Sequence, residues 1–409
     1  MSKYGLCGEK LAHSYSETIH NMLGNKDYKL LSMSKDEFYK FFSERNFNAV
    51  NVTIPYKKDA LALCDSVSDE AAQIGSVNTV VNKNGKLYGY NTDIFGFIEM
   101  AKRAKIDFSG KKVLIFGSGG TSLTAHAASE VMGAEKIITV SRTGKVNYEN
   151  VLSESDADIL INTTPVGMYP NNGSCIIDFD LFPKLSGAID VVYNPHTTEF
   201  VRRAKVRGIP CTSGLYMLVA QAVKAHELFF DTTITKRDDV IADIYKKCRN
   251  AMMNIILVGM PGSGKSTVGK LIANITGREF FDSDDIINQT ENCSPAEIIK
   301  NRGEEAFRKI ESEVIKELSK KSACVIVTGG GAVIKEENRT AIRQNSNVVF
   351  IERSINELAT ESRPLSDGGN ALEKLFFQRE TYYREVSDFT SENKNDALEC
   401  AEYIVNKLL

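Results

Sequence analysis

The sequence lacks the long apolar runs that membrane proteins need. No stretch of about 18 apolar residues occurs, so we expect no transmembrane helix. The first ten residues contain no basic segment followed by an apolar run, so we also expect no signal peptide. These two absences predict a cytoplasmic protein.

A strong basic excess is missing as well. The chain holds 50 Lys and Arg against 53 Asp and Glu, a formal net charge of -3, which argues against nucleic-acid binding. The eight cysteines are scattered and none forms a C-x-x-C pair, which favours reduced thiols over disulfides or a zinc site. We therefore expect small-molecule partners, with no nucleic acid, no membrane and no obligate protein partner.

The chain has 409 residues, more than the ~100–200 of a typical domain, so we expect at least two domains. Apolar β-branched runs alternate with helical patterns, which predicts an α/β fold with parallel sheets and helices on both faces. The predicted strands are 49–53, 112–116, 136–140, 159–162, 188–192, 254–258, 324–328 and 347–351. The predicted helices are 92–104, 121–132, 197–206, 214–229, 236–250 and 265–275. We place a domain boundary at 250–253, where no Gly/Ser-rich linker is visible.

Two strand–glycine–helix units occur, and the first follows the strand at 112–116. Its turn contains Gly117, Gly119 and Gly120 before an alanine-rich helix. Glycines let the backbone approach a pyrophosphate, and a helix N-terminus offers free N–H groups and a positive dipole. The pattern predicts a dinucleotide site, with a plain tight turn as the alternative.

The end of the next strand bears on which dinucleotide binds. Sites for NAD usually carry an acidic residue there, but this chain has Ser141, Arg142 and Thr143. A hydroxyl-bearing, basic segment suits the 2′-phosphate of NADP. The alternative is that Arg142 is a solvated surface residue.

The second unit, at 259–266, is a complete G-x-x-x-x-G-K-S motif between a strand and a helix. In this motif backbone N–H groups cradle phosphates, the lysine neutralises their charge and the serine reaches Mg²⁺. We assign ATP binding to Gly259, Gly262, Gly264, Lys265, Ser266 and Thr267.

Acidic residues follow this motif. Asp282 and Asp284 lie two residues apart, so on a strand both would point toward the phosphates, one for hydrated Mg²⁺ and one for an acceptor hydroxyl. No histidine follows His226, so a carboxylate must act as base in this half. Phosphoryl transfer depends mainly on positioning and charge neutralisation, so a carboxylate suffices.

Lys57 and Asp93 form a second candidate pair in the first half. Lys57 follows a strand and a proline turn, which would place it at the edge of a cleft. A lysine beside a carboxylate can donate a proton to a ketone oxygen while a hydride arrives from a nicotinamide. Taken alone, a surface lysine and a helix-start aspartate are the commoner roles.

Over residues 1–250 the chain resembles the shikimate dehydrogenase family. The motifs appear in the family's order, at 8–16, 51–57 (N-V-T-I-P-Y-K), 75–79 (G-S-V-N-T), 91–93 (N-T-D), 162–168, 193–195 and 214–221. Glu17 stands where the family often has proline, and Ser141 where it often has asparagine.

This resemblance implies NADPH-dependent reduction of 3-dehydroshikimate to shikimate, with Lys57 and Asp93 as the catalytic pair. It assigns substrate binding to Ser14, Ser16, Thr53, Asn78, Tyr193 and Gln221, and cofactor binding to Gly214. It also implies a substrate-binding domain over 1–100, completed by helices in 210–250, and a Rossmann-type NADP domain over 101–209.

Residues 253–409 resemble the shikimate kinase family, which implies a P-loop α/β domain of nucleoside-monophosphate-kinase type. The likeness rests on the glycine motif, 282–284, 303–308, 328–332, 363–365 and 379–384. It assigns shikimate to Asp284, Arg308, Arg384, Gly330 and Gly331, Mg²⁺ to Ser266 and, through water, Asp282, and a lid over ATP to Arg363. The family often has another arginine near the adenine, where this chain has Asn356.

The two resemblances together predict a bifunctional enzyme that makes shikimate and then its 3-phosphate, with NADPH, ATP and Mg²⁺. One alternative is a first half that prefers quinate and NAD. Another is a non-catalytic metabolite sensor. A degenerate sensor should have lost catalytic groups, yet they are present at Lys57, Asp93, Lys265, Ser266 and Asp284.

Overall fold

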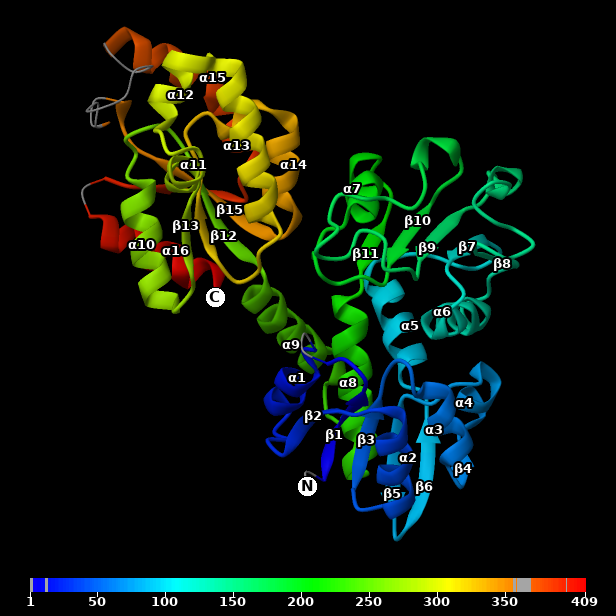
Figure 1. Cartoon of the computed structure of the whole chain (residues 1–409). Helices are drawn as coiled ribbons and strands as arrows, with labels where there is room; N and C mark the ends of the chain where they lie inside the picture. Colours follow the sequence, from blue (N-terminus) through cyan, green and yellow to red (C-terminus); the bar gives the residue numbers. More distant parts are fainter. Residues whose placement is uncertain (1–2, 12–13, 356–357, 359–368, 395) are drawn as a thin grey trace. The chain divides into compact units, whose positions relative to one another are not determined.

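The computed structural model describes residues 3–11, 14–355, 358, 369–394 and 396–409. The chain forms two compact units, Met1–Cys248 and Arg249–Leu409 (Figure 1). The division falls inside helix α9, Arg237–Met252, slightly before the predicted boundary at 250–253. In the part of the chain that the structure describes, no helix is long and apolar enough to span a membrane.

The first sheet has six strands in the order β2-β1-β3-β5-β6-β4. Their bounds are β1 Tyr4–Gly8, β2 Tyr28–Ser32, β3 Ala49–Val52, β4 Ser66–Val67, β5 Thr79–Lys83 and β6 Lys86–Tyr90. This sheet is parallel except at β5, which runs antiparallel to both β3 and β6. The reason is local: Asn84 and Gly85 have φ of 53° and 80°, the left-handed pair of a two-residue hairpin.

Helices cover both faces of this sheet. On one face, Phe38 and Phe42 of α2 pack against Cys7, Val50 and Val80. On the other, the long helix α8 supplies Ala225 and Phe229 to a cluster with Leu6 and Ala49. The helices of this part are α1 Ser16–Met22, α2 Lys35–Glu44, α3 Lys57–Leu63, α4 Asp69–Ile74, α5 Asp93–Arg103 and α8 Leu215–Phe230.

The second sheet is fully parallel, with five strands in the order β11-β10-β9-β7-β8. The strands are β7 Lys112–Phe116, β8 Lys136–Val140, β9 Ile159–Asn162, β10 Gly187–Asp190 and β11 Cys211–Ser213. The first three confirm their predicted bounds, whereas β10 ends two residues earlier than predicted. Helices α6 Gly120–Val131 and α7 Glu199–Val206 and the short turns η1 Val151–Glu154 and η2 Phe179–Leu181 connect these strands. The finer division of this unit at residues 100 and 209 stays a prediction.

The second unit holds a parallel sheet in the order β13-β14-β12-β15-β16. The strands are β12 Asn254–Val258, β13 Phe280–Asp282, β14 Val325–Val327, β15 Ser346–Glu352 and β16 Phe389–Glu392. The helices are α10 Lys265–Thr276, α11 Ser283–Glu291, α12 Pro295–Arg302, α13 Glu304–Ser319, η3 Ala332–Ile334, α14 Glu336–Gln344, α15 Gly369–Val386 and α16 Ala397–Leu408.

The apolar central strand β12 explains why helices cover both faces of this sheet. Successive side chains of a strand point to opposite faces. Ile255 and Leu257 pack with residues of α10 and α16. Ile256 and Val258 pack with residues of α13, α14 and α15. The carboxyl end of β12 therefore opens directly into the glycine motif between two helical layers.

Candidate active sites

A pocket of about 790 Å³ lies in the first unit, at the carboxyl ends of its strands. It is large enough for a small metabolite. Every residue that the sequence analysis assigned to substrate or proton transfer in this half lines it, namely Ser14, Ser16, Thr53, Lys57, Asn78, Asp93, Tyr193 and Gln221. Gly214 lines it too, as do Lys10, Asn51 and Thr121, which had no assigned role.

Lys57 and Asp93 meet in this pocket. Each is the first residue of a helix, Lys57 of α3 and Asp93 of α5. The Lys57 Nζ lies 2.5 Å from Asp93 Oδ2, and the two side chains are only 17% and 13% exposed. A turn after β3, closed by the Tyr56 N–H donating to the Thr53 carbonyl at 3.0 Å, delivers Lys57 to this point. The pair is a shielded proton donor beside a fixed carboxylate.

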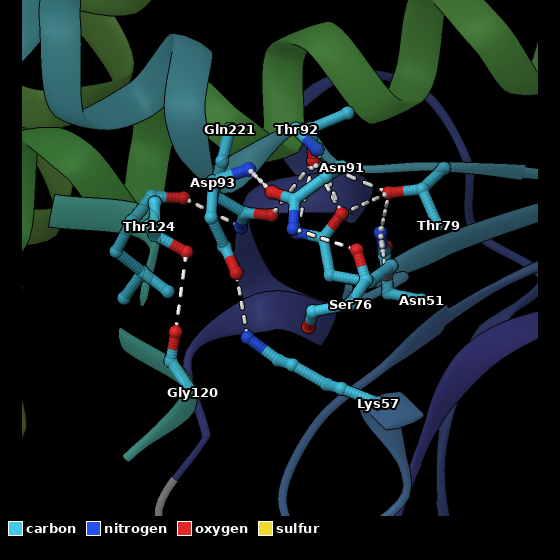
Figure 2. A network of polar contacts seen from close by, with 12 residues as sticks. Asn51, Lys57, Ser76, Thr79, Asn91, Thr92, Asp93, Gly120, Thr124 and Gln221 are labelled. Carbon is cyan, nitrogen blue, oxygen red and sulfur yellow. Dashed lines mark hydrogen bonds and ion pairs between the residues drawn. The ribbon is translucent and has the colours of Figure 1, made fainter. Parts of the chain in front are cut away.

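A buried network of polar contacts lies next to the Lys57–Asp93 pair (Figure 2). The side-chain oxygen of Asn91 accepts from the Asp93 N–H at 3.1 Å, and its side-chain NH₂ donates to the Ser76 backbone carbonyl at 2.9 Å. Asn78 accepts from the Thr92 N–H at 2.7 Å. The Thr92 hydroxyl in turn donates to Gln221 at 3.4 Å. These bonds tie the start of α5 to strand β5 and to helix α8, so the pocket has a fixed floor.

Asn51 is part of this floor although the sequence analysis gave it no role. It accepts from the Tyr28 hydroxyl at 2.8 Å and donates to the Thr79 hydroxyl at 3.0 Å. Its spacing in the sequence could have indicated a role in the pocket, because Asn51 lies two residues before Thr53 and side chains two residues apart on an extended chain point to the same face.

The two serines lie together at the start of α1. The Ser14 hydroxyl donates to the Ser16 hydroxyl at 3.1 Å, and the Ser16 N–H donates to the Ser14 oxygen at 3.3 Å. Lys10 adds a cation to the same lining. The two adjacent hydroxyls make their end of the pocket suitable for a carboxylate.

The first glycine turn leads into the twelve-residue helix α6, and Gly119 is its N-cap. A Cβ at Gly119 or Gly120 would meet no other atom within 4 Å, while Gly117 has φ of 114° and closes against Thr163. An open glycine face at a helix N-terminus fits a pyrophosphate. Ser141, Arg142 and Thr143 form a turn after β8, where the Gly144 N–H donates to the Ser141 carbonyl, and they do not line the pocket. Their role with NADP stays a prediction.

The second unit has a pocket of about 450 Å³ over its glycine motif. Gly262 and Gly264 have φ of 84° and 87°, which wraps the loop before α10. The buried Lys265 Nζ donates to the carbonyls of Gly259 and Met260 at 2.9 and 2.8 Å. Lys265 and Ser266 line the pocket, while Thr267 lies exposed in the first turn of α10.

The two aspartates both line this pocket, but not along one strand as predicted. Asp282 ends β13 and caps α11, accepting from the Asp284 N–H at 3.0 Å, so Asp284 lies in the first helical turn. Asp282 also accepts from the Ser266 hydroxyl at 2.7 Å. A hydroxyl and a carboxylate in contact at the phosphate loop fit a hydrated Mg²⁺.

Arg308 lines the pocket as predicted and is 8% exposed. Its guanidinium donates to Glu311 at 2.8 Å and to Glu304 at 3.0 Å. Burial raises the pKa of the Glu311 carboxyl, the Arg308 charge opposes this, and the charge of Asp284 adds to it. Glu311, which also lines the pocket, was missed by the sequence analysis; it lies one helical turn after Arg308.

The glycine triplet lies against this arginine and the phosphate loop. A Cβ at Gly330 would lie 2.5 Å from Pro261 Cδ, and one at Gly331 would overlap the Arg308 guanidinium. A side chain at Gly330 would clash with the Pro261 ring, and one at Gly331 would displace the Arg308 guanidinium, so the backbone itself lines the pocket at both positions.

Arg384 does not line this pocket. It is 48% exposed and pairs with Glu380 at 2.8 Å and Glu352 at 2.9 Å. Arg379, five residues earlier on α15, is 5% exposed, lines the pocket and donates to the Gly330 carbonyl at 3.2 Å. Five residues along a helix turn a side chain by about 140°, so only one of the two arginines can face the site. The predicted Arg363 and Asn356 lie outside the described residues.

Two family models match the chain. The model of the shikimate dehydrogenase substrate binding domain matches residues 6–80, and the shikimate kinase model matches residues 261–409.

Curated relatives match the first unit. The shikimate dehydrogenase (NADP(+)) of Clostridium perfringens (strain SM101 / Type A) is 39% identical over 275 residues, covering 61% of this chain and 100% of the relative. The protein of the same name from Clostridium beijerinckii is 39% identical over 250 residues, covering 56% of this chain and 92% of the relative.

Solved structures match the same region. Shikimate dehydrogenase 1 from Peptoclostridium difficile has a TM-score of 0.55 at 37% identity, covering 61% of this chain and 98% of its own. A chorismate mutase/shikimate 5-dehydrogenase fusion protein from Clostridium acetobutylicum has a TM-score of 0.55 at 31% identity, covering 60% of this chain and 96% of its own. The shikimate 5-dehydrogenase of Thermus thermophilus in complex with NADP(H) and shikimate has a TM-score of 0.54 at 30% identity, covering 60% of this chain and 99% of its own.

Proposed function

Because the chain belongs to the shikimate dehydrogenase family through its first unit and carries a shikimate kinase domain in its second, we propose that it is a bifunctional enzyme. It reduces 3-dehydroshikimate to shikimate with NADPH and then phosphorylates the 3-hydroxyl of shikimate with ATP and Mg²⁺. The observation that carries the proposal is that each unit pairs a polar pocket with a glycine-rich turn at a helix N-terminus.

The reduction needs a hydride at the C3 carbonyl and a proton at its oxygen. NADPH supplies the hydride when it is bound at the open glycine face of Gly119 and Gly120. Lys57 donates the proton from Nζ to the developing alkoxide, and Asp93 at 2.5 Å holds that ammonium in place. Lys57 then regains its proton from water, which restores the ammonium group for the next turnover.

The rest of the first pocket orients the substrate. Ser14 and Ser16 bind its carboxylate through their adjacent hydroxyls. Asn78, Gln221, Thr53 and Tyr193 contact its ring hydroxyls. Because Asn78 and Gln221 are both bonded to Thr92, their amides keep one orientation, and the substrate meets a preorganised floor.

The choice of NADPH over NADH rests on Arg142. The segment after β8 carries no carboxylate that would repel a 2′-phosphate, and Arg142 supplies a cation for it. A cofactor comparison separates this proposal from a first half that prefers quinate and NAD.

The kinase step needs a base, phosphate neutralisation and a grip on shikimate. ATP supplies the γ-phosphoryl group when bound at the glycine motif. Asp284 accepts the proton of the 3-hydroxyl, and Lys265 exchanges its two carbonyl partners for phosphate oxygens. Arg308 and Arg379 hold the carboxylate of shikimate, since both are buried in the lining.

Ser266 and Asp282, which share a hydrogen bond of 2.7 Å, would hold the magnesium ion, which would neutralise phosphate charge. Within the described ranges, no cluster of three or more His, Cys, Asp or Glu could hold a metal on its own. Binding of Mg²⁺ therefore depends on nucleotide phosphates, with the Ser266 hydroxyl as a direct ligand and Asp282 acting through water. We further propose the cytoplasm as the location, where the eight free thiols stay reduced.

Product analysis by mass spectrometry tests the proposal. The protein receives 3-dehydroshikimate, NADPH, ATP and Mg²⁺, with single omissions. We expect shikimate 3-phosphate from the full mixture and shikimate alone without ATP. Lys265→Ala should stop at shikimate, and Lys57→Ala should form no shikimate. No reduction by the intact chain with either NADPH or NADH would rule out the dehydrogenase and favour a non-catalytic sensor.

A further inference from the structure

Helix α9, which contains the division between the two units, contacts the loop that carries Tyr193. The Tyr245 hydroxyl in α9 lies 3.0 Å from Nε2 of His196. His196 follows Tyr193 by three residues in the loop between β10 and α7, and Tyr193 lines the first pocket. Tyr245 does not line the pocket, but one short loop connects its partner His196 to Tyr193, which does.

Tyr245 is itself firmly held. Its ring packs edge-on against Tyr216 of α8, with centroids 5.4 Å apart. The guanidinium of Arg103, at the end of α5, lies 4.5 Å from the Tyr245 centroid and 5.0 Å from that of Tyr216. Such cation–π contacts stabilise the rings against sliding. Helices α5 and α8 carry Asp93 and Gln221, so Tyr245 packs on the same helices that present the pocket's own side chains.

Separate contacts hold the successive parts of this loop. It forms no helix or strand between β10 and α7. Its start is held by the Val192 N–H, which donates to Asp190 at 3.0 Å. Its middle is held by the Asn194 carbonyl, which accepts from the Tyr169 N–H at 3.0 Å. Near its end the loop is held by the Thr198 hydroxyl, which donates to Asp190 at 2.6 Å, and the contact between His196 and Tyr245 adds a restraint from a separate helix.

On the substrate side, the Tyr193 ring meets Tyr15 edge-on at 6.4 Å. Burial raises the pKa of both phenols, so both stay neutral hydrogen-bonding groups. Tyr15 is the residue between Ser14 and Ser16. A shift of the loop would therefore move Tyr193 and disturb its contact with the proposed carboxylate end of the pocket.

We propose that Tyr245 is a positioning residue of the dehydrogenase site, which holds His196 and thereby sets Tyr193 against the substrate. This inference rests on the proposed reduction of 3-dehydroshikimate. The helix that enters the second unit is thus part of the scaffold of the first unit's substrate pocket.

Tyr245→Phe tests this inference because it removes one hydroxyl and keeps the ring between Arg103 and Tyr216. Loss of one hydrogen bond should raise the KM for 3-dehydroshikimate about 3- to 10-fold. The KM for NADPH, the kcat and the kinase activity of the same protein should stay within about twofold of wild type. Kinase activity and the melting temperature report that the chain is folded.

A matched control is Tyr4→Phe, which also removes one hydroxyl, the acceptor of a hydrogen bond from the Asn48 amide at 3.2 Å, and lies at the start of β1. It should leave all these constants unchanged. A double-mutant cycle with His196→Ala adds a second readout, because residues that act through one contact give non-additive effects.

The outcomes separate this inference from the proposed function. A wild-type chain that does not reduce 3-dehydroshikimate overturns both. An active wild type in which Tyr245→Phe matches Tyr4→Phe, or in which the two substitutions of the cycle are additive, overturns the role of Tyr245 alone. A raised substrate KM, an unchanged kcat and non-additivity support it.

Discussion

Two arginines of one motif differ in whether they face the second pocket. Arg379 is buried in the lining and donates to the Gly330 carbonyl, whereas Arg384 is half exposed and satisfied by two glutamates. Both lie in the same motif, yet only one faces the pocket.

We predict that Arg379→Lys raises the KM for shikimate in the kinase reaction about 10- to 100-fold, because lysine lacks the planar fork that binds a carboxylate at two points. Arg384→Lys should change it less than about twofold, since exposed ion pairs contribute little. Steady-state kinase kinetics give both values, and the dehydrogenase activity of each variant serves as the folding control. An effect of Arg384→Lys as large as that of Arg379→Lys would contradict the assignment.

Asp190 is a buried carboxyl group at the end of β10. Its oxygens accept from the Val192 N–H at 3.0 Å, the Asn162 amide at 3.0 Å and the Thr198 hydroxyl at 2.6 Å. Burial raises its pKa to about 7, and these three donors only partly offset the effect.

A raised pKa means that the folded state binds the proton more tightly than the unfolded state. This tighter proton binding contributes fully to the free energy of unfolding below about pH 4, the ordinary pKa range of an aspartate. The contribution is lost as the pH rises through about 7. Asp190→Asn cannot titrate, and its side-chain oxygen can still accept a hydrogen bond. We therefore predict that the stability of wild type relative to Asp190→Asn falls between about pH 4 and 7 and is constant above. Urea unfolding of both proteins across this range measures the difference, and a difference independent of pH would contradict the prediction.

At the scale of elements, the close approach of α5 and α8 positions Asp93 and Gln221. Gly96 makes this approach possible, because a Cβ there would lie 2.6 Å from the Met217 carbonyl and 3.0 Å from the Gln221 Cβ. The glycine is unfavourable for the helix itself by ~1 kcal/mol relative to alanine. Its presence reflects packing between helices and not helix propensity.

We predict that Gly96→Ala destabilises the first unit by ~1–3 kcal/mol through overpacking, despite alanine's better helix propensity. The substitution should also lower kcat/KM for reduction, because α5 carries Asp93. Thermal unfolding and dehydrogenase kinetics measure the two effects, with kinase activity unchanged. Lys102→Ala, on the exposed side of the same helix, is the matched control, and an equal effect there would count against the packing argument.

At the scale of the whole molecule, each unit has its own hydrophobic core. The clusters around Phe38 and Leu114 lie in the first unit, and those around Ile256 and Leu257 in the second. A ligand stabilises only the folded unit that binds it.

We predict two unfolding transitions in differential scanning calorimetry, of which ATP with Mg²⁺ raises one and NADPH the other. Saturation at about 100 times Kd should add ~2.7 kcal/mol to the unit concerned. Lys265→Ala should abolish the shift by ATP and leave that by NADPH intact. A single transition that both nucleotides raise would show that the units unfold together.

The sequence by itself determined the two nucleotide sites, the strands that lead into them and the residue types of both pockets. The glycine motif at 259–266 is readable because a phosphate loop is made by consecutive residues, and its backbone geometry depends on their identity. The same holds for the turn at 117–120 and for Thr53 and Lys57, which follow β3 within five residues.

Only the tertiary structure decided which side chains meet. Lys57 and Asp93 are 36 residues apart, and their contact depends on how α3 and α5 start against one sheet. The choice of Arg379 over Arg384 depends on which face of α15 packs on the site, and the link from Tyr245 to His196 spans 49 residues. The physical reason is that local backbone geometry is set by neighbours in the chain, whereas contacts between elements are set by burial of their apolar faces.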